Sequence, residues 1–344
     1  MIIILMQLSG FEPVGIPMNV PAKDAPTKNQ HGLVIATLKA DSPTAETPPS
    51  RPARLGGQVR YYRWSSPEKT ATVIYETLGA GPTVLLLPAF STVSTRVELA
   101  RIAQVLSAQF QVVALDWLGF GDSDRPAWVY GRSLYQTLLK DFVRDCCPQA
   151  AGIVAAGHGA GYALHLAQAE LTGDTRLLLV APTWKGPLRA MGAPGWLATG
   201  VRNLIRLPII GPLLYGLNTR PAFLKWMYQR HVFVDGAQLT PAFMAQRYRL
   251  TQQVGARFAP AAFVTAALDP MIDRGEWLQV AAAAAQNMTT HVIVADQAPP
   301  QSLAEMQALS ELPGVSSDRL PGSLGLHEEY GDRVGEIALD VFSA

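Results

Sequence analysis

The sequence predicts an α/β protein with a mostly parallel central sheet, helices on both faces and one helical insertion. Three observations support this. Of its 344 residues, 49% are hydrophobic and only 16% are charged, a composition that allows a large buried core. Short runs rich in Val and Leu alternate with amphipathic segments, as in sheets covered by helices on both sides. The alternation is interrupted once, between residues 182 and 268.

The first segment, residues 1–57, has a different composition from the rest. It contains eight prolines and no sustained hydrophobic period. Such a segment buries too little apolar surface to fold by itself. We therefore expect a mostly disordered leader, with a docking or targeting tail as the alternative.

Residues 58–183 are expected to form the first part of the folded core. The β-rich segments Gln58–Trp64 and Ala71–Glu76 predict a leading antiparallel pair. Buried strands are then expected at Thr83–Leu87, Phe110–Leu115, Gly152–Ala156 and Arg176–Ala181. Amphipathic helices are expected between them at Val97–Ala108, Ser133–Cys146 and Ala160–Leu171.

Residues 184–270 predict a helical lid. Pro, Gly and aromatic residues are frequent there, strand patterns are absent, and Pro208 and Pro212 prevent one long helix. The many apolar residues from Leu204 to Leu217 are expected to form the underside of the lid, packed over a pocket. The alternative is a surface that accepts a lipid, isoprenoid or pigment tail, or that touches a membrane.

The core is expected to resume at residues 271–344. Strands are predicted at His291–Ala295 and Val315–Leu320, and helices at Glu276–Gln286, Ser302–Glu311 and Glu329–Phe342.

Charge, apolar runs and cysteine content limit the ligands and the cellular location that we expect. The net charge is +1, from 28 basic and 27 acidic residues, which argues against a nucleic-acid partner. No apolar run reaches the ~18 residues of a membrane span, and the apolar start lacks the basic flank of a secretory signal. The adjacent Cys146 and Cys147 fit neither a disulfide nor a metal-binding spacing. We therefore expect a cytoplasmic protein, peripheral membrane contact being open, with no metal and no cofactor.

Three motifs in this order resemble the α/β-hydrolase superfamily. Residues 85–90, Leu-Leu-Leu-Pro-Ala-Phe, resemble its third strand and oxyanion loop. Residues 116–123, Asp-Trp-Leu-Gly-Phe-Gly-Asp-Ser, resemble its D-x-x-G-x-G-x-S signature, in which we expect Ser123 to hold the turn. Residues 157–161, Gly-His-Gly-Ala-Gly, resemble its nucleophile elbow, G-x-S-x-G. Residues 181–184, 267–270 and 304–306 narrow the resemblance to a cyanobacterial and plastid branch.

The resemblance assigns Gly159 to the nucleophile position. Glycine has no atom that can form an acyl-enzyme, but it accepts the positive φ of the elbow at little cost. Among residues of the oxyanion and ligand pocket, the resemblance implies that Phe90 and Ala160 supply backbone N–H donors, beside Ala89 and Trp184. An alternative makes His158 a general base acting on bound water.

The other two triad positions also depart from the family pattern. Alignment on Glu329 and Val334 places Leu324 at the catalytic histidine position and makes His327 structural, whereas a shift of three residues makes His327 the base. The acid position after the seventh strand falls on Ala298 or Pro299, and Asp296 is too early. We interpret Asp269 as a helix cap or lid anchor.

Two functions follow from these departures. The first is a non-catalytic protein that binds a small apolar ligand or a partner protein, a pseudoenzyme. The second is a hydrolase or lyase that acts on an apolar ester-like substrate by a non-covalent mechanism with His158 or His327 as the base.

Overall fold

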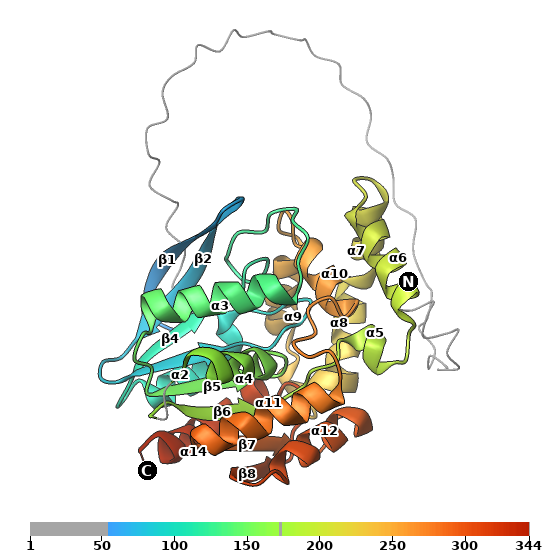
Figure 1. The fold of residues 1–344 in the computed structure, drawn as a ribbon. Coiled ribbons are helices and arrows are strands. Elements are labelled where there is room, and N and C mark those ends of the chain that lie inside the picture. The colour runs from blue at the N-terminus through green and yellow to red at the C-terminus, as the bar shows by residue number, and fades with distance from the viewer. Residues whose placement is uncertain (1–53, 172–173, 344) are drawn as a thin grey trace, which may run out of the picture. The chain divides into compact units, whose positions relative to one another are not determined.

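The computed structural model describes residues 54–171 and 174–343, so the predicted leader lies outside it up to residue 53. Its centre is an eight-stranded sheet in the order β1-β2-β4-β3-β5-β6-β7-β8 (Figure 1). The β1–β2 and β2–β4 pairs are antiparallel, and all later pairs are parallel. The predicted α/β class with a mostly parallel sheet is confirmed. The strands are β1 (Gln58–Ser66), β2 (Lys69–Leu78), β3 (Thr83–Leu87), β4 (Gln111–Leu115), β5 (Gly152–Ala156), β6 (Arg176–Val180), β7 (Thr290–Ala295) and β8 (Val315–Leu320).

The central strands form the core because they are apolar along their whole length. All five residues of β5 are buried, and so are four of the five in β3 and in β6. Strands covered on both faces have no polar side to present to water, which explains their continuous apolar sequence. The carboxyl ends of β3, β5 and β6 therefore lie side by side, and the loops that follow them meet there.

Helices cover the sheet as the sequence predicts. The helix α2 packs against α14, and α4 packs against both α3 and α11. A 3-10 turn at Arg96–Leu99 precedes α2, so the single predicted helix has two parts. The helices of the core are α2 (Ala100–Leu106), α3 (Arg132–Cys146), α4 (Gly159–Glu170), α11 (Arg274–Asn287), α12 (Pro300–Ser310), α13 (Leu326–Glu329) and α14 (Gly331–Ser343).

Residues 54–57, which the sequence assigned to the leader, are packed onto the sheet. The Leu55 side chain is buried. The backbone N–H groups of Arg54, Leu55 and Gly57 all donate to the Glu76 carboxylate on β2, at 2.8, 2.8 and 2.9 Å. Residues 54–57 thus belong to the folded core, which the sequence did not predict because a single buried Leu and backbone donors leave no periodic signal.

A helical insertion separates β6 from α11 and has no strand of its own. Pro208 lies in the break between α6 and α7, as predicted, whereas Pro212 lies within the first turn of α7, where a missing N–H costs nothing. The insertion contains α5 (Pro187–Ala190), α6 (Gly195–Arg206), α7 (Ile210–Asn218), α8 (Pro221–Met227), a π-helical turn (Tyr228–Val232), a 3-10 turn (Gly236–Gln238), α9 (Pro241–Thr251) and α10 (Phe258–Val264).

The insertion does not bury its apolar residues as predicted. Ile209 is 84% exposed and Leu213 66% exposed. Only one side of α6 packs inward, through Ala198, Val201 and Ile205. The prediction of a wholly buried lid underside is therefore wrong for these positions. In the part of the chain that the structure describes, none of the helices has both the length and the apolar character needed to cross a bilayer.

Candidate functional site

The sharp turn between β5 and α4 is built differently from the prediction. The residue with positive φ is Gly157, at +51°, directly after β5, and α4 already begins at Gly159. Gly159 is not among the residues with positive φ. The expectation that Gly159 relieves the strain of the turn is therefore wrong, and Gly157 has that role.

The surroundings of the two glycines differ. A Cβ atom at Gly159 would lie 3.1 Å from the Pro88 carbonyl oxygen and 3.3 Å from that of Leu87, at the end of β3. A Cβ at Gly157 would lie 2.9 Å from the Ala89 Cβ and 3.8 Å from the Thr183 hydroxyl oxygen. A side chain at position 157 would thus point toward the loops that follow β3 and β6, whereas one at position 159 would point at the backbone where β3 ends.

The loops after β5 and β6 bring a hydroxyl, an imidazole and a carboxylate together. His158 Nδ1 lies 2.8 Å from Thr183 Oγ1, within hydrogen-bond distance. His158 Nε2 lies 3.7 Å from Asp269 Oδ1 and makes no hydrogen bond among the described residues. His158 and Asp269 are buried, whereas Thr183 is partly exposed. We name these three residues the Thr183 cluster.

Asp269 also fixes the start of the insertion. Its Oδ1 accepts from the Gly186 N–H at 2.7 Å, and its Oδ2 lies 3.2 Å from Arg189 Nη1. These contacts agree with the interpretation of Asp269 as an anchor and not with a helix cap, because Asp273 caps α11. Sequence reasoning missed Thr183 as a partner of His158, since 25 residues separate them and only the parallel pairing of β5 and β6 brings them together.

The loop after β3 fills the space that the resemblance assigned to a ligand. The Phe90 ring is buried and stacks on Trp117 at a centroid distance of 4.9 Å. Ala89 is buried and its carbonyl accepts from Ser94 Oγ. The Ala160 N–H donates to the Gly157 carbonyl at 3.2 Å, so the turn itself uses this expected oxyanion donor. The predicted pocket of Phe90, Ala89 and Ala160 is thus mostly packed protein.

Trp184, the fourth predicted pocket residue, is buried beneath two cations. Lys185 Nζ and the Arg189 guanidinium lie 4.7 and 4.9 Å from its ring centroid. The cavity that Trp184 lines with Thr183, Lys185 and Glu305 measures only about 10 Å³, the room of one water.

His327 belongs to a second buried cluster. Its Nε2 lies 3.3 Å from Glu98 Oε2, and its Nδ1 makes no hydrogen bond among the described residues. Arg247 is fully buried beside it, 3.9 Å from Glu98 and paired with Glu328. Burial raises the pKa of the Glu328 carboxyl, and the Arg247 charge opposes this shift. Leu324 packs on the main core, and its N–H donates to the His231 carbonyl.

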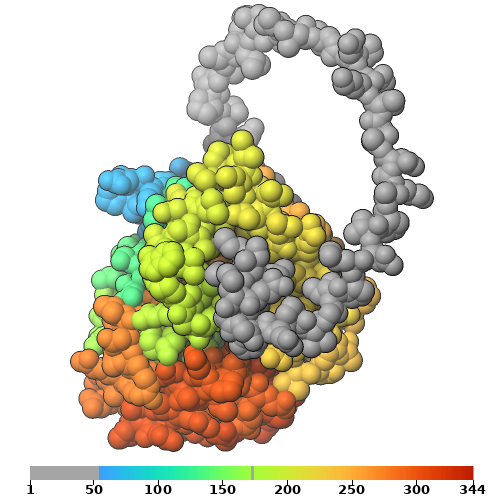
Figure 2. All heavy atoms as spheres, turned by 90° about the vertical axis from the view of Figure 1, so that its right-hand side faces the viewer, coloured from blue at the N-terminus to red at the C-terminus, as the bar shows by residue number. Residues whose placement is uncertain are grey.

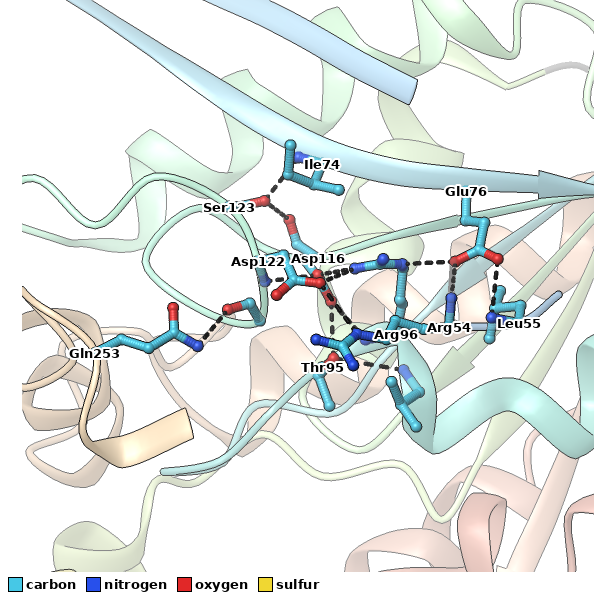
Figure 3. A network of polar contacts seen from close by, with 12 residues as sticks. Arg54, Leu55, Ile74, Glu76, Thr95, Arg96, Asp116, Asp122, Ser123 and Gln253 are labelled. Carbon is cyan, nitrogen blue, oxygen red and sulfur yellow. Dashed lines mark hydrogen bonds and ion pairs between the residues drawn. The ribbon is translucent and has the colours of Figure 1, made fainter. Parts of the chain in front are cut away.

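The predicted signature at residues 116–123 forms a third cluster (Figure 3). The buried Arg96 guanidinium pairs with Glu76, Asp116 and Asp122. Burial raises the pKa of Asp116, and the charge of Arg96 opposes the shift. As expected, Ser123 holds its turn: its hydroxyl donates to the Asp116 carbonyl and accepts from the Ile74 N–H. This cluster joins β2, β4 and the loop after β3.

The remaining candidates are accounted for by other contacts. Asp296 pairs with Arg319 at the surface, and Ala298 is buried. Burial raises the pKa of the Cys147 thiol to about 12, so this cysteine is not a thiolate near neutral pH. Among residues 54–171 and 174–343, no group of three His, Cys, Asp or Glu side chains is placed to hold a metal.

A cavity of about 380 Å³ lies beside α6 and the end of α10. Arg202 projects there, with Nη1 3.4 Å from Thr265 Oγ1 and Nη2 3.5 Å from Thr199 Oγ1. Burial lowers the pKa of Arg202, and the charge of Arg206 lowers it further. The cavity is lined by Arg189, Ala193, Gly195, Ala198, Thr199, Arg202, Thr265, Ala266 and Ala267.

Solved structures similar to this one share its fold. A bromoperoxidase from Bacillus anthracis aligns with a TM-score of 0.63 and 15% identity, over 83% of this chain and all of that one. A hydrolase from Pseudomonas aeruginosa gives 0.62 and 15%, over 84% of this chain and 100% of that one. An enol-lactonase from Burkholderia xenovorans gives 0.58 and 17%, over 80% and 97%.

The search of curated proteins finds no match to the chain. Residues 84–334 match the family described as the alpha/beta hydrolase family. The match runs from β3 into α14 and includes the insertion. The narrower resemblance to a cyanobacterial and plastid branch stays a prediction. Because the match spans well over half of the chain, the protein belongs to the alpha/beta hydrolase family.

Proposed function

We propose that this protein binds a small molecule without forming an acyl-enzyme. The observation that carries the proposal is the turn after β5, where the residue with positive φ, Gly157, and the motif position, Gly159, both lack a side chain. A Ser-His-acid mechanism needs an attacking atom at this point. The second supporting observation is that His327 contacts Glu98 in a cluster with Arg247.

The ligand site in this proposal is the 380 Å³ cavity beside α6, a volume within the range of small-molecule sites. Ala193, Ala198, Ala266 and Ala267 line it and leave room for an apolar body. Arg202 has only long contacts to two hydroxyls, and no carboxylate of the described residues lies within ion-pair distance. An uncompensated, partly desolvated guanidinium favours a carboxylate or phosphate. The ligand class is therefore a small molecule with an apolar body and one anionic group.

Titration calorimetry with octanoate and octan-1-ol tests this proposal. Octanoate is expected to bind the wild-type protein and raise its Tm, because a ligand of the folded state stabilises it. Arg202→Gln is expected to weaken octanoate binding about tenfold, the loss of one charge-assisted contact. Ala198→Leu should block the cavity without a change of charge.

The matched control is Arg249→Gln, which removes an exposed arginine of α9 away from the cavity. Equal binding of octanol and octanoate, or an unchanged affinity in Arg202→Gln, would contradict the proposed ligand class. The wild-type protein is also expected to give no burst with p-nitrophenyl octanoate and no labelling by a fluorophosphonate probe.

One contact favours a second function, ester hydrolysis at the Thr183 cluster. If His158 Nδ1 is unprotonated, the Thr183 hydroxyl donates to it across 2.8 Å, and Nε2–H faces Asp269. The imidazole then takes the hydroxyl proton as Oγ1 attacks an ester carbonyl, and returns it to the leaving alcohol. Water hydrolyses the acyl-threonine in the same way. The adjoining space of about 10 Å³ restricts this chemistry to a very small acyl group.

Turnover of p-nitrophenyl acetate separates the two functions. The second function predicts hydrolysis by the wild-type protein that Thr183→Val and His158→Ala both abolish, with the fold retained by circular dichroism. His327→Ala, which lies in a different cluster, is the control and should leave the rate unchanged. No turnover by the wild-type protein, together with octanoate binding, would leave only the first function.

A further inference from the structure

The solvent side of α7 carries an apolar surface that no other part of the described chain covers. It consists of Leu207, Ile209, Ile210, Leu213 and Leu217, all exposed, and we name it the α7 apolar surface. In Figure 2 the insertion, coloured lime to yellow, occupies the upper part of the face shown, above the orange and red C-terminal part. Contiguous exposed aliphatic side chains of this kind mark an interaction site.

In α7 apolar side chains lie on the solvent side, where an ordinary surface helix carries polar ones. Ile209, Leu213 and Leu217 are spaced four residues apart, so they lie on one side of α7. Gly211 lies on the opposite side, which packs against α6. A Cβ there would lie only 1.9 Å from the Ile205 carbonyl oxygen. No residue of α7 is charged. The outward side of this helix is therefore apolar and uncharged.

The chain segment that carries this surface has charges of one sign only. Between Pro182 and Val234 the chain contains no Asp or Glu, although acidic and basic residues are balanced over the whole chain at 27 and 28. Arg220, Lys225 and Arg230 are exposed, and no carboxylate of the described residues lies within ion-pair distance of them. The basic residues of this segment are Lys185, Arg189, Arg202, Arg206, Arg220, Lys225 and Arg230.

We infer that the α7 apolar surface docks onto a bilayer that contains anionic lipids. Leu and Ile side chains enter the boundary between headgroups and acyl chains, while Arg220, Lys225 and Arg230 contact lipid phosphates. The exposed Trp196 and Trp226 suit the same interface, where the indole ring has an apolar body and a polar N–H. This inference is independent of the proposed ligand site.

A second copy of the chain is a poorer occupant. A symmetric dimer through α7 would bring two acid-free, basic segments against each other, and like charges across an interface are unfavourable. An anionic bilayer supplies both the apolar phase and the opposite charge.

Vesicle flotation with the full-length chain tests the inference. The protein is expected to float with vesicles of phosphatidylcholine and one-third phosphatidylglycerol at low salt, and at least tenfold less with phosphatidylcholine alone. High salt should release it in part, since salt screens the charges but leaves apolar insertion intact. Absence of flotation with both compositions at low salt would overturn the inference.

Two pairs of variants assign the binding to this surface. The double variant Ile209→Asn and Leu213→Asn is expected to lower the partition coefficient at least tenfold. Its control is Val254→Asn with Ile272→Asn, since these residues are 97% and 62% exposed and lie outside the α7 apolar surface. The double variant Arg220→Gln and Lys225→Gln should reduce binding roughly fivefold for each charge removed. Its control is the double variant Arg63→Gln and Arg249→Gln.

Equal losses in a test pair and its control would overturn the assignment to α7. Light scattering tests the alternative that a second copy of the chain covers the α7 apolar surface. A dimer in solution that Ile209→Asn with Leu213→Asn makes monomeric would identify a second copy as the partner and would also overturn the inference.

Discussion

Gly159 lies against the end of β3. This position determines how a serine placed there would affect stability and esterase activity. A Cβ there would be 3.1 Å from the Pro88 carbonyl oxygen. Gly159→Ser is therefore expected to cost about 1 kcal/mol of stability, a mild overpacking. The nearest neighbours of that Cβ are the Pro88 and Leu87 carbonyl oxygens and the Leu87 Cβ, none of them a base, so we expect p-nitrophenyl ester hydrolysis to stay at the background rate.

Gly157→Ser is the comparison for this prediction. Position 157 has φ +51° and the added Cβ would lie 2.9 Å from the Ala89 Cβ, so the loss of stability should be larger than at 159. Strong esterase activity in Gly159→Ser alone would show that a base and an acid already face that position, and would contradict this prediction.

The Glu76 carboxylate predicts an acid-sensitive stability. Burial alone raises its pKa, but the N–H groups of Arg54, Gly57 and Leu55 and the Arg96 guanidinium outweigh burial and lower it below the usual 4.5. A carboxyl whose folded-state pKa is depressed stabilises the fold above its unfolded-state pKa, and the contribution is lost as the pH falls through the folded-state value.

Glu76→Gln should therefore lower the free energy of unfolding by about 2 kcal/mol at neutral pH, and the difference from wild type should shrink as the pH falls below 4.5. Urea unfolding at several pH values measures this difference. Glu68→Gln, in the exposed turn between β1 and β2, is the control and should show no such pH dependence. A constant difference between Glu76→Gln and wild type across the pH range would show that the carboxylate charge is not what stabilises this region.

At the scale of elements, local patterns predicted the sheet well. The bounds of β3, β5 and β8 agree with the expected ranges. Continuous apolar runs define β3 and β5, whereas β8, with the sequence Val-Ser-Ser-Asp-Arg-Leu, is mostly polar and exposed. The 3-10 turn before α2 was not predicted, since its cause is tertiary: Thr95 and Arg96 are held by the carboxylate of Asp116, the residue after β4.

The candidate site was predicted less well, because its contacts are also tertiary. His158 was identified from the motif, but its partners Thr183 and Asp269 come from the end of β6 and the end of the insertion. Their meeting depends on the order of strands and on how the insertion closes. Neither property leaves a local signal in the sequence.

Asp269 links the two ends of the insertion and supports a prediction at this scale. It accepts from the Gly186 N–H and pairs with Arg189 next to α5. Asp269→Ala leaves a buried N–H without a partner and should cost about 2 kcal/mol. Limited trypsin digestion should then cleave faster at Lys185 and Arg189, because local opening exposes them.

Asp273→Ala provides the control for this variant. Asp273 caps α11 and its loss costs about 1 kcal/mol, but it does not contact α5 and should leave the rate of cleavage at those two sites unchanged. Equal cleavage rates in both variants would mean that global stability, and not the Asp269 anchor, protects the segment.

At the scale of the whole molecule, the core and its insertion carry three separate features. The carboxyl ends of the strands hold the Thr183 cluster, and the insertion adds both the Arg202 cavity and the α7 apolar surface. The sequence predicted that this insertion is apolar and helical. It placed Ile209 and Leu213 on the buried side, although they face water, because α7 has no charged residue to mark its solvent side.

The start of the folded core gives a prediction for the whole molecule. Leu55 is buried, and the N–H groups of Arg54, Leu55 and Gly57 satisfy Glu76 together with Arg96. A chain that begins at Pro52 keeps these contacts, whereas a chain that begins at Gln58 loses a buried Leu and leaves a buried carboxylate short of donors. The shorter chain should be less stable by about 4 kcal/mol.

Comparison of the two shortened chains by thermal unfolding checks this expectation. The chain from Gln58 should melt about 10 °C below the chain from Pro52, since 1 kcal/mol corresponds to a few degrees at this size. Leu55→Ala in the longer chain separates the apolar part and should account for about half of the loss. Equal melting temperatures would show that β2 holds Glu76 without residues 54–57, and that the buried Arg96 cluster stabilises this edge of the sheet by itself.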